Sequence, residues 1–254
     1  MNIRGFKCFA EKQIELNNMT VLTGANASGK SSVIQALLLL KYASESDGAL
    51  TQLSLEEPRF AFDFGSADSL INNEWKEDEV VIALQDGGAM GFDGGKQEGQ
   101  RQLLTGVDGL DKLKAVFANG LTYFTAERLG PRYEYALKAG DGRDCGCRGE
   151  NTGNVMADNW RTKIDGKRLL VKSDEESLFN IALDNWVDYI FPGINVRVQP
   201  VGTQTYQVII RDSYHNYPTQ ATNIGFGISY ALPILVGALL AKKDSWLVVE
   251  NPEA

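Results

Sequence analysis

The residues from Gly24 to Ser31 constrain the fold of this chain more than any other stretch of its sequence. They read Gly-Ala-Asn-Ala-Ser-Gly-Lys-Ser, the P-loop pattern of two glycines with four residues between them, followed by Lys and Ser. Residues 19–23 before them are apolar and β-branched, and residues 32–40 after them favour a helix. The sequence therefore predicts a strand, a glycine-rich loop and a helix in the order that a phosphate-binding loop needs. A turn that only connects a strand to a helix would explain neither Lys30 nor the second glycine.

This loop is predicted to hold the phosphates of a nucleotide. Glycines let main-chain N–H groups curl around phosphate oxygens, and the following helix presents unpaired N–H groups and the positive end of its dipole. Lys30 would lie on the β- and γ-phosphates, and the Ser31 hydroxyl would bind a Mg²⁺ ion that bridges them. We therefore expect ATP and Mg²⁺ as ligands. The residues predicted to contact the nucleotide in this loop are Asn26, Ala27, Ser28, Gly29, Lys30, Ser31 and Ser32.

The composition is that of an ordinary globular protein with an acidic balance. The chain has 254 residues, 43% of them hydrophobic, and a net charge of −8. An acidic total gives no support to DNA binding, although a local basic strip is compatible with it. The N-terminus lacks the apolar core of a signal peptide, and the longest apolar stretch, residues 230–241, is too short to span a membrane. We expect a cytoplasmic protein with no membrane segment.

Three cysteines and one histidine offer little material for a metal site. Cys145 and Cys147 could form half of a thiolate cluster, but the sequence has no second cysteine pair, and His215 is distant in the chain. A closed zinc site normally needs four ligands. The glycines and charges of residues 139–153 instead predict an exposed loop with reduced, non-ligating thiols.

Hydrophobic periodicity predicts an α/β fold with a β-rich middle. Two short antiparallel strands should lead into the P-loop strand, the helix after the loop should run to about Ala43, and a glycine-dense turn is expected over residues 87–95. The sequence shows no sustained heptads, so we exclude a coiled-coil insertion and expect a single head over residues 1–254. The other expected elements are strands 60–64, 80–84 and 121–125, helices 110–117 and 174–190, and a hairpin of strands 194–198 and 206–210.

Two further segments have the form of nucleotide-binding elements. Gly225, Gly227 and Ser229 stand just ahead of a predicted helix that runs to about residue 241, as at an anion-binding helix start. Residues 246–250 then form an apolar strand that ends on Glu250. An acid at the carboxyl end of such a strand faces the crevice where a P-loop holds Mg²⁺, so Glu250 is a candidate Walker B acid and, with Ser31, a metal ligand.

With these elements in this order, the chain resembles the ABC-type ATPases of the SMC, RecF and OLD group, compact AAA-like ATPases of bacterial anti-phage and DNA-maintenance operons. The resemblance implies a P-loop NTPase fold of ABC/SMC-head type, with a mixed central sheet, an antiparallel β subdomain and flanking helices. It also implies two ATP molecules sandwiched between two protomers, with Gly225, Gly227 and Ser229 on the partner's γ-phosphate and Glu250 on the Mg²⁺ shell. The segments that carry it are residues 3–9, 22–32, 127–132, 225–229 and 249–254.

The chain departs from this family's pattern at two points. The residue after the Walker B acid is commonly a glutamate that activates water, and here it is Asn251, which cannot accept a proton. Glu253 is the alternative catalytic acid. The chain also ends at Ala254, where the family normally continues, so we expect a C-terminally incomplete head with weak hydrolysis. Two further interpretations stay open, since Arg128 and Arg132 either reach a phosphate or partner protomer, or pair with nearby acids.

The function expected from the sequence is an ATP-binding ATPase head that closes as a homodimer around ATP and Mg²⁺. Closure would act as a switch for an effector, such as a nuclease partner, in phage defence or DNA maintenance. A hydrolysis-deficient ATP sensor or scaffold is the first alternative, because of Asn251. A small-molecule P-loop kinase is the second, although it would not explain the arrangement from Gly225 to Glu250.

Overall fold

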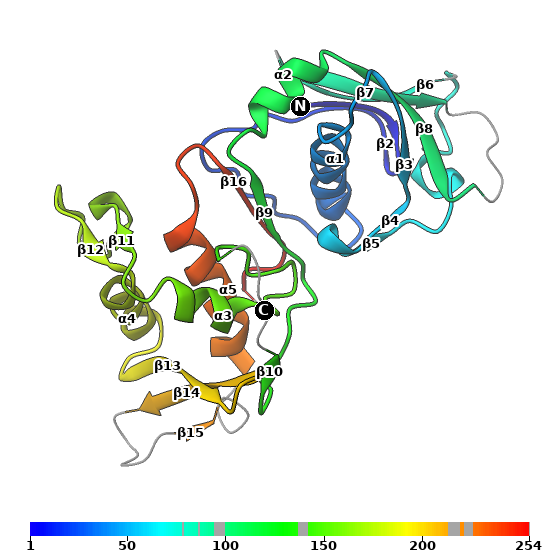
Figure 1. The fold of residues 1–254 in the computed structure, drawn as a ribbon. Helices are drawn as coiled ribbons and strands as arrows, with labels where there is room; N and C mark the ends of the chain where they lie inside the picture. Colours follow the sequence, from blue (N-terminus) through cyan, green and yellow to red (C-terminus); the bar gives the residue numbers. More distant parts are fainter. Residues whose placement is uncertain are drawn as a thin grey trace. The chain divides into compact units, whose positions relative to one another are not determined.

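The computed structural model describes residues 1–77, 79–85, 87–93, 100–136, 142–212, 219–220 and 226–253. The chain divides into two compact units, residues 1–121 and residues 122–254. Figure 1 colours the first unit from blue to green and the second from green to red. We describe each unit by itself, and the single head expected over residues 1–254 stays a prediction.

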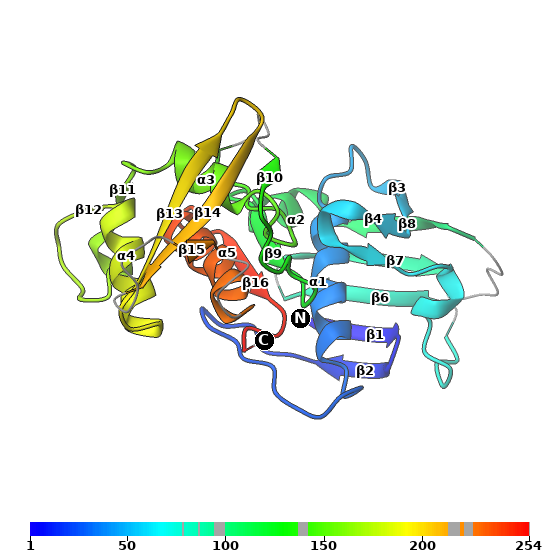
Figure 2. The ribbon, with the colours of Figure 1, turned by 90° about the horizontal axis from the view of Figure 1, so that it is seen from below.

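The first unit is built on a six-stranded sheet that is antiparallel throughout, in the strand order β2-β1-β6-β7-β8-β3. Helix α1 (Lys30–Ala43) lies across the face of this sheet (Figure 2). The short helix α2 (Leu110–Val116) follows β8. The strands are β1 (Asn2–Phe6), β2 (Phe9–Gln13), β3 (Leu50–Ser54), β6 (Glu79–Leu84), β7 (Gly88–Asp93) and β8 (Gln102–Asp108), with the two-residue pair β4 (Glu56–Glu57) and β5 (Phe62–Asp63) and the 3₁₀ turns η1 (Pro58–Phe60) and η2 (Ala67–Leu70).

The core of this unit follows from the two periodicities of its elements. Alternate residues of the strands, such as Ile3, Ile82 and Met90, are fully buried. Helix α1 buries most of its length after Val33, including all four leucines of residues 37–40. Because apolar surface is buried on both the helix and the sheet, α1 is held in one position on the sheet. This packing also fixes where the N-terminus of α1 lies within this unit.

The sequence predicted most of the local elements of the first unit correctly, and it was wrong at three segments. The N-terminal strand pair, α1, β6 and α2 are confirmed. Residues 60–64 form a 3₁₀ turn and the short β5 instead of a strand, because Pro58 starts η1. The expected glycine turn over residues 87–95 is largely strand β7, and the turn itself closes at Gly87, whose N–H donates to the Leu84 carbonyl at 3.2 Å.

The predicted strand at residues 19–23 is also wrong. The structure assigns no strand there, and Met19 and Val21 are 82% and 67% exposed. A strand exists only where a neighbour accepts its hydrogen bonds, and the sheet of this unit ends at β2. The segment that enters the glycine-rich loop is therefore an extended connection in this unit, and the mixed central sheet implied by the resemblance stays a prediction.

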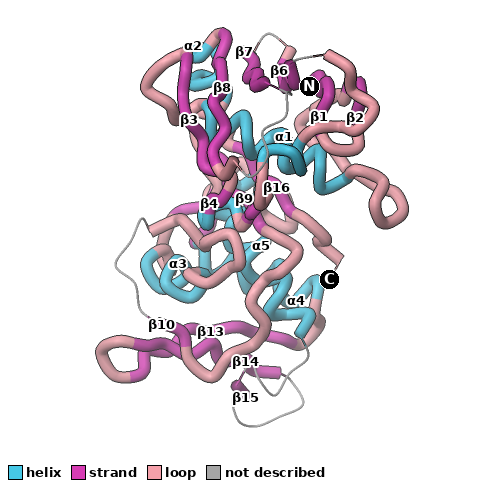
Figure 3. The backbone as a smooth tube through the Cα atoms, turned by 90° about the vertical axis from the view of Figure 1, so that its right-hand side faces the viewer, coloured by secondary structure: helices cyan, strands magenta, loops and turns pink. Residues whose placement is uncertain are grey.

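The second unit packs three helices between two groups of strands (Figure 3). The hairpin of β13 (Ile194–Val201) and β14 (Thr205–Asp212) pairs with β10 (Tyr135–Ala136) and β15 (Thr219–Gln220), and β9 (Leu121–Phe124) pairs with β16 (Trp246–Val249). The helices are α3 (Thr152–Asp158), α4 (Phe179–Ile190) and α5 (Phe226–Leu240), beside the small pair β11 (Lys163–Ile164) and β12 (Ser177–Leu178) and the turn η3 (Gly166–Arg168). One core joins all of these groups, including Phe124, Val155, Phe179, Val196 and Val236.

The prediction of an exposed loop over residues 139–153 differs from the structure where this segment is described. Cys145 is 0% exposed and Cys147 is 8% exposed, and both belong to the packed interior. Hydrogen bonds hold the segment down: the Thr125 N–H donates to the Cys147 carbonyl at 2.9 Å, and the Asn151 N–H donates to the Cys145 carbonyl at 2.9 Å. The glycines of this segment therefore indicate tight turns in its backbone and not an exposed loop.

The helix predicted over residues 174–190 begins later, at Phe179, because Ser177 and Leu178 pair with β11. The hairpin of residues 194–198 and 206–210 is confirmed and extends at both ends. The longest helix in the described part of the chain is α5, with 15 residues. Among the helices that the structure describes, none has the length and apolar character needed to cross a bilayer.

Candidate functional site

The glycine-rich loop is exposed at the start of α1. Residues 23–28 are all exposed, and Ala27 and Gly29 have left-handed backbones with φ of 63° and 94°. A left-handed alanine costs energy, and such strain often marks a ligand-binding turn. No side chain caps α1 in the described part of the chain, and its first turn carries no acid. The N–H groups that an anion would contact are therefore not covered by a capping side chain.

Lys30 closes over the loop that precedes it. Its Nζ donates to the carbonyl oxygens of Gly24 at 2.7 Å and Ala25 at 2.9 Å. The ammonium group thus bridges two main-chain carbonyls of the loop. Because a phosphate attracts an ammonium more strongly than a neutral carbonyl does, Lys30 can exchange these bonds for a ligand.

The second glycine is required by packing as well as by backbone conformation. A Cβ atom at Gly29 would lie 2.6 Å from Cζ of Phe9 and 2.8 Å from Sγ of Cys8. The hairpin of β1 and β2 therefore supports the loop from behind. The P-loop pattern predicted the importance of Gly29. It did not predict that Cys8 and Phe9 lie against the loop, because that contact depends on the fold.

The residues present fit the triphosphate and Mg²⁺ that the pattern predicts. The loop supplies main-chain N–H groups, one ammonium group and the hydroxyl groups of Ser31 and Ser32, which suit phosphate oxygens and a hard cation. The structure places the seven predicted loop residues in one continuous turn ending in the first turn of α1.

The candidate acid lies at the end of β16 in the second unit. The Glu250 N–H donates to the Phe124 carbonyl at 2.9 Å, and the Tyr123 hydroxyl donates to Oε2 of Glu250 at 2.8 Å. Burial, and then the neighbouring carboxylate, raise the pKa of Tyr123, so the phenol stays protonated and remains a donor. Sequence analysis did not single out Tyr123.

Arg128 is buried at 4% exposure and binds the main chain at the end of the same strand pair. Its Nη1 donates to the carbonyls of Thr125 at 3.0 Å and Glu250 at 2.7 Å, and its Nη2 donates to the carbonyl of Asn251 at 2.6 Å. Its guanidinium carbon lies 5.7 Å from the centre of the Tyr230 ring. The described contacts of Arg128 are with carbonyl groups and not with a nearby acid, and the interpretation that it reaches a phosphate or a partner protomer stays a prediction.

The other predicted catalytic residues lie on the surface after β16. Asn251 and Glu253 are exposed, and Asn251 has a left-handed backbone with φ of 47°. Asparagine tolerates that conformation better than most residues. The described residues of the second unit thus bring Glu250, Asn251 and Glu253 together with Arg128 and Tyr123 at one end of the β9–β16 pair.

The predicted signature turn differs from the expectation in its local structure. Gly225 lies outside the described residues. Gly227 and Ser229 are not ahead of the helix but inside the first turn of α5, which starts at Phe226. Gly227 is exposed, whereas Ser229 is half-buried and lines a narrow cavity beside Tyr135 and Tyr206.

In the part of the chain that the structure describes, Cys145 and Cys147 do not belong to a cluster of three or more His, Cys, Asp or Glu side chains that could hold a metal ion. Neither cysteine forms a disulfide, and burial raises the pKa of Cys145 to about 12 and that of Cys147 to about 11. They are therefore protonated core residues at neutral pH.

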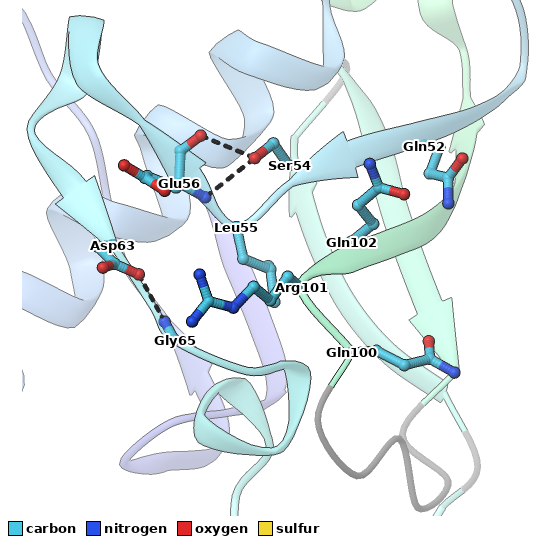
Figure 4. A pocket seen from close by; sticks show the side chains of 9 residues that line it. All are labelled: Gln52, Ser54, Leu55, Glu56, Asp63, Gly65, Gln100, Arg101 and Gln102. Carbon is cyan, nitrogen blue, oxygen red and sulfur yellow. Dashed lines mark hydrogen bonds between the residues drawn. The ribbon is translucent and has the colours of Figure 1, made fainter.

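A cavity of about 490 Å³ in the first unit lies beside β3, β5 and β8, and no residue of the glycine-rich loop lines it (Figure 4). Arg101 projects into it, and its Ser54 and Asp63 side chains already bind the main chain of Glu56 and Gly65. Nothing in the sequence singled this cavity out, and no predicted site residue lines it. The full lining is Gln52, Ser54, Leu55, Glu56, Asp63, Gly65, Gln100, Arg101 and Gln102.

A mixed α/β chain with a glycine-rich Lys-Ser loop opening a packed helix belongs to the class of P-loop nucleotide-binding proteins. The comparison with family models makes this specific: the chain belongs to the AAA domain family, whose model matches residues 1–186. This family has an ATPase-type nucleotide-binding function and generally binds ATP with Mg²⁺. The match includes the loop, Tyr123 and Arg128 and ends before Gly225 and Glu250. No curated protein and no solved structure matched the chain.

Proposed function

We propose that this chain is an ATPase head that binds ATP and Mg²⁺ through the loop from Gly24 to Ser31. The observation that carries the proposal is the geometry of that loop: residues 23–28 are exposed, Ala27 and Gly29 have left-handed backbones, no side chain caps α1 among the described residues, and the ammonium of Lys30 bonds to the loop carbonyls. It lies within the stretch that matches the family model. Ser31 and Glu250 are proposed to hold the Mg²⁺ ion, which neutralises charge on the phosphate oxygens.

The proposed reaction is hydrolysis of the terminal phosphate. A water oxygen attacks the γ-phosphorus, the bond from that phosphorus to the β–γ bridging oxygen breaks, and ADP and inorganic phosphate leave. Lys30 and the main-chain N–H groups of the loop bind the phosphate oxygens as charge develops on them. Asn251 orients the water and Glu253 accepts its proton, because an amide cannot do so. We propose slow hydrolysis on these grounds.

The proposed use of ATP is a switch between two protomers. Binding would close a homodimer, with Gly225, Gly227 and Ser229 of one protomer on the γ-phosphate held by the other. Only a nucleotide that retains this phosphate could join the two, so hydrolysis would reopen the pair. An effector such as a nuclease, in phage defence or DNA maintenance, would respond to closure. The support for this step is the resemblance of the motifs, and their order in the chain.

The decisive experiment measures phosphate release and nucleotide binding side by side. Wild type, Lys30→Ala and Glu253→Gln are compared in phosphate release with Mg²⁺ and in binding of a fluorescent ATP analogue. We expect Lys30→Ala to lose binding and Glu253→Gln to keep binding but lose release. Wild-type release no higher than that of Lys30→Ala would overturn the ATPase proposal. Light scattering with ATP, compared between wild type and Gly227→Asp, tests closure.

A second candidate function is an ATP sensor that does not hydrolyse. The observation that favours it is Asn251, whose exposed amide stands where related enzymes carry the base and whose carbonyl is bound by Arg128. Tight ATP binding with no phosphate release would support the sensor. Transfer of labelled phosphate to a metabolite instead of water would support the kinase alternative.

A further inference from the structure

Arg128 is the most heavily bonded buried cation in the described part of the second unit, and no sequence rule predicts what it binds. Its side chain donates three hydrogen bonds of 2.6 to 3.0 Å, all to main-chain carbonyls. The neighbouring acid Glu127 pairs instead with Arg148, at 3.7 Å on the surface. Burying a guanidinium without a paired carboxylate costs desolvation free energy, and the three hydrogen bonds must offset that cost.

The three carbonyls and the ring that surround Arg128 come from three segments that are far apart in sequence. Thr125 follows β9, Glu250 and Asn251 follow β16, and Tyr230 lies in the second turn of α5. The planar fork of the guanidinium gives one nitrogen to Glu250 and the other to Asn251, two successive carbonyls of one turn. A lysine cannot present two donors in that fixed geometry.

The turn that Arg128 holds contains a residue with a left-handed backbone. Asn251 is left-handed, and its carbonyl must point inward for the bond to Arg128. The direction of the Glu250 side chain and the path of the chain to Glu253 both depend on this turn. Tyr123 holds the Glu250 carboxylate from the other side.

We propose that Arg128 is a positioning residue that locks the Glu250–Asn251 turn onto α5 and so fixes the direction of the acids that follow β16. This inference rests on the proposed function, because it assigns Arg128 a part in the same site. Arg128 touches no reacting atom and acts only through the main chain of Glu250 and Asn251. It predicts a loss of turnover without a matching loss of nucleotide affinity, since affinity comes from the loop at Lys30.

The test compares Arg128→Gln and Arg128→Lys with Arg148→Gln, which removes an exposed arginine from the same packed region. We expect Arg128→Gln to lower kcat at least tenfold, with KM for ATP within twofold of wild type. Arg128→Lys should keep the charge and still lose most of the rate, whereas Arg148→Gln should match wild type. Unchanged kcat in Arg128→Gln, or a change in KM alone, would overturn the proposal.

Hydrogen exchange provides a readout that needs no activity. The amides of Glu250, Asn251 and Glu253 should exchange at least tenfold faster in Arg128→Gln than in wild type or Arg148→Gln, and equal exchange would also overturn the proposal. If wild type neither binds nor hydrolyses ATP, the proposed function fails, and the exchange rates alone decide whether Arg128 holds the turn. If both Arg128 variants unfold, Tyr230→Leu removes the ring beside the guanidinium. It should raise the same exchange rates, and unchanged rates count against the proposal.

Discussion

The sulfur of Cys8 lies 3.6 Å from the hydroxyl oxygen of Ser32, so the turn between β1 and β2 touches the first turn of α1 beside the glycine-rich loop. Cys8 is exposed, whereas the other two cysteines are buried. N-ethylmaleimide should therefore label Cys8 alone in the native protein. The added group cannot fit between the hairpin and Gly29, so we expect at least a fivefold loss of ATP affinity, measured by fluorescent-nucleotide binding.

The control for this labelling is Cys8→Ser, which should bind ATP as wild type does and be insensitive to the reagent. Bound ATP with Mg²⁺ should slow the labelling of wild type. Full labelling with unchanged affinity would mean that the loop does not hold the nucleotide in the way proposed.

Replacing Gly29 with alanine should damage both the fold and the site. The left-handed backbone disfavours any Cβ, and this one would overlap Phe9 and Cys8. We expect about 2–4 kcal/mol of lost unfolding free energy in urea, from strain plus overpacking. Gly120→Ala is the matched control, because Gly120 has a similar φ of 92° with nothing within 4 Å of the added atom. It should cost only the backbone strain, and equal losses in the two variants would contradict the packing argument.

The buried thiols predict a loss of stability at alkaline pH. Burial raises the pKa of Cys145 to about 12, above the value of about 8.5 that a thiol has in the unfolded chain. The folded state therefore binds this proton more tightly, and its contribution is complete below about pH 8.5 and is lost as the pH rises toward 12. Urea unfolding at pH 7.5, 9 and 10 should show falling stability. The unfolding free energy of Cys145→Ala, taken relative to its value at pH 7.5, should fall less with pH than that of wild type. An identical decrease in both proteins would show that this thiol does not cause it.

Two glycines inside helices should respond to alanine with opposite signs. An added Cβ at Gly153 would overlap the Tyr206 ring, whereas at Gly227 it would make only an ordinary contact with Phe191 at 3.7 Å. Alanine normally stabilises a helix relative to glycine by about 1 kcal/mol. We expect Gly227→Ala to raise the melting temperature and Gly153→Ala to lower it by overpacking. A rise in both would show that Tyr206 moves aside at little cost.

The hydrogen bond from Tyr123 to Glu250 predicts a milder catalytic defect than that of Arg128→Gln. Tyr123→Phe keeps the ring in place and removes one donor to the carboxylate. We expect a two- to tenfold lower kcat and a higher Mg²⁺ concentration for half-maximal phosphate release, because the acid is less firmly oriented. Steady-state rates over a Mg²⁺ titration measure both effects. If this variant has the same Mg²⁺ titration curve as wild type, the hydrogen bond from Tyr123 does not help to orient Glu250.

Local signals predicted the local structure and the loop. The apolar pattern of residues 32–40 predicted α1, the alternation of residues 194–198 and 206–210 predicted the β13–β14 hairpin, and the glycines before Lys30 predicted the turn that precedes α1. What the sequence could not predict depends on contacts between distant residues. The Arg128 side chain binds carbonyls more than 120 residues away, and Cys145 is buried because its loop bonds to Thr125 and α3. Residues 19–23 carry a strand pattern without a pairing partner in the first unit, and periodicity contains no information about partners.

The core of the second unit has a practical consequence for the choice of fragments. The stretch that matches the family model stops at residue 186, within α4, yet Phe124 and Phe179 pack in the same core as Ile228, Leu232 and Val236 of α5. A polypeptide cut at that limit would lack the end of α4, the β13–β14 hairpin, the whole of α5 and the partner strand of β9. The unpaired edge of β9 and the apolar core surface that α5 normally covers would be exposed to solvent and would favour aggregation. Soluble expression and crystallisation trials should therefore set their borders from the packing and retain the whole of α5 and β16.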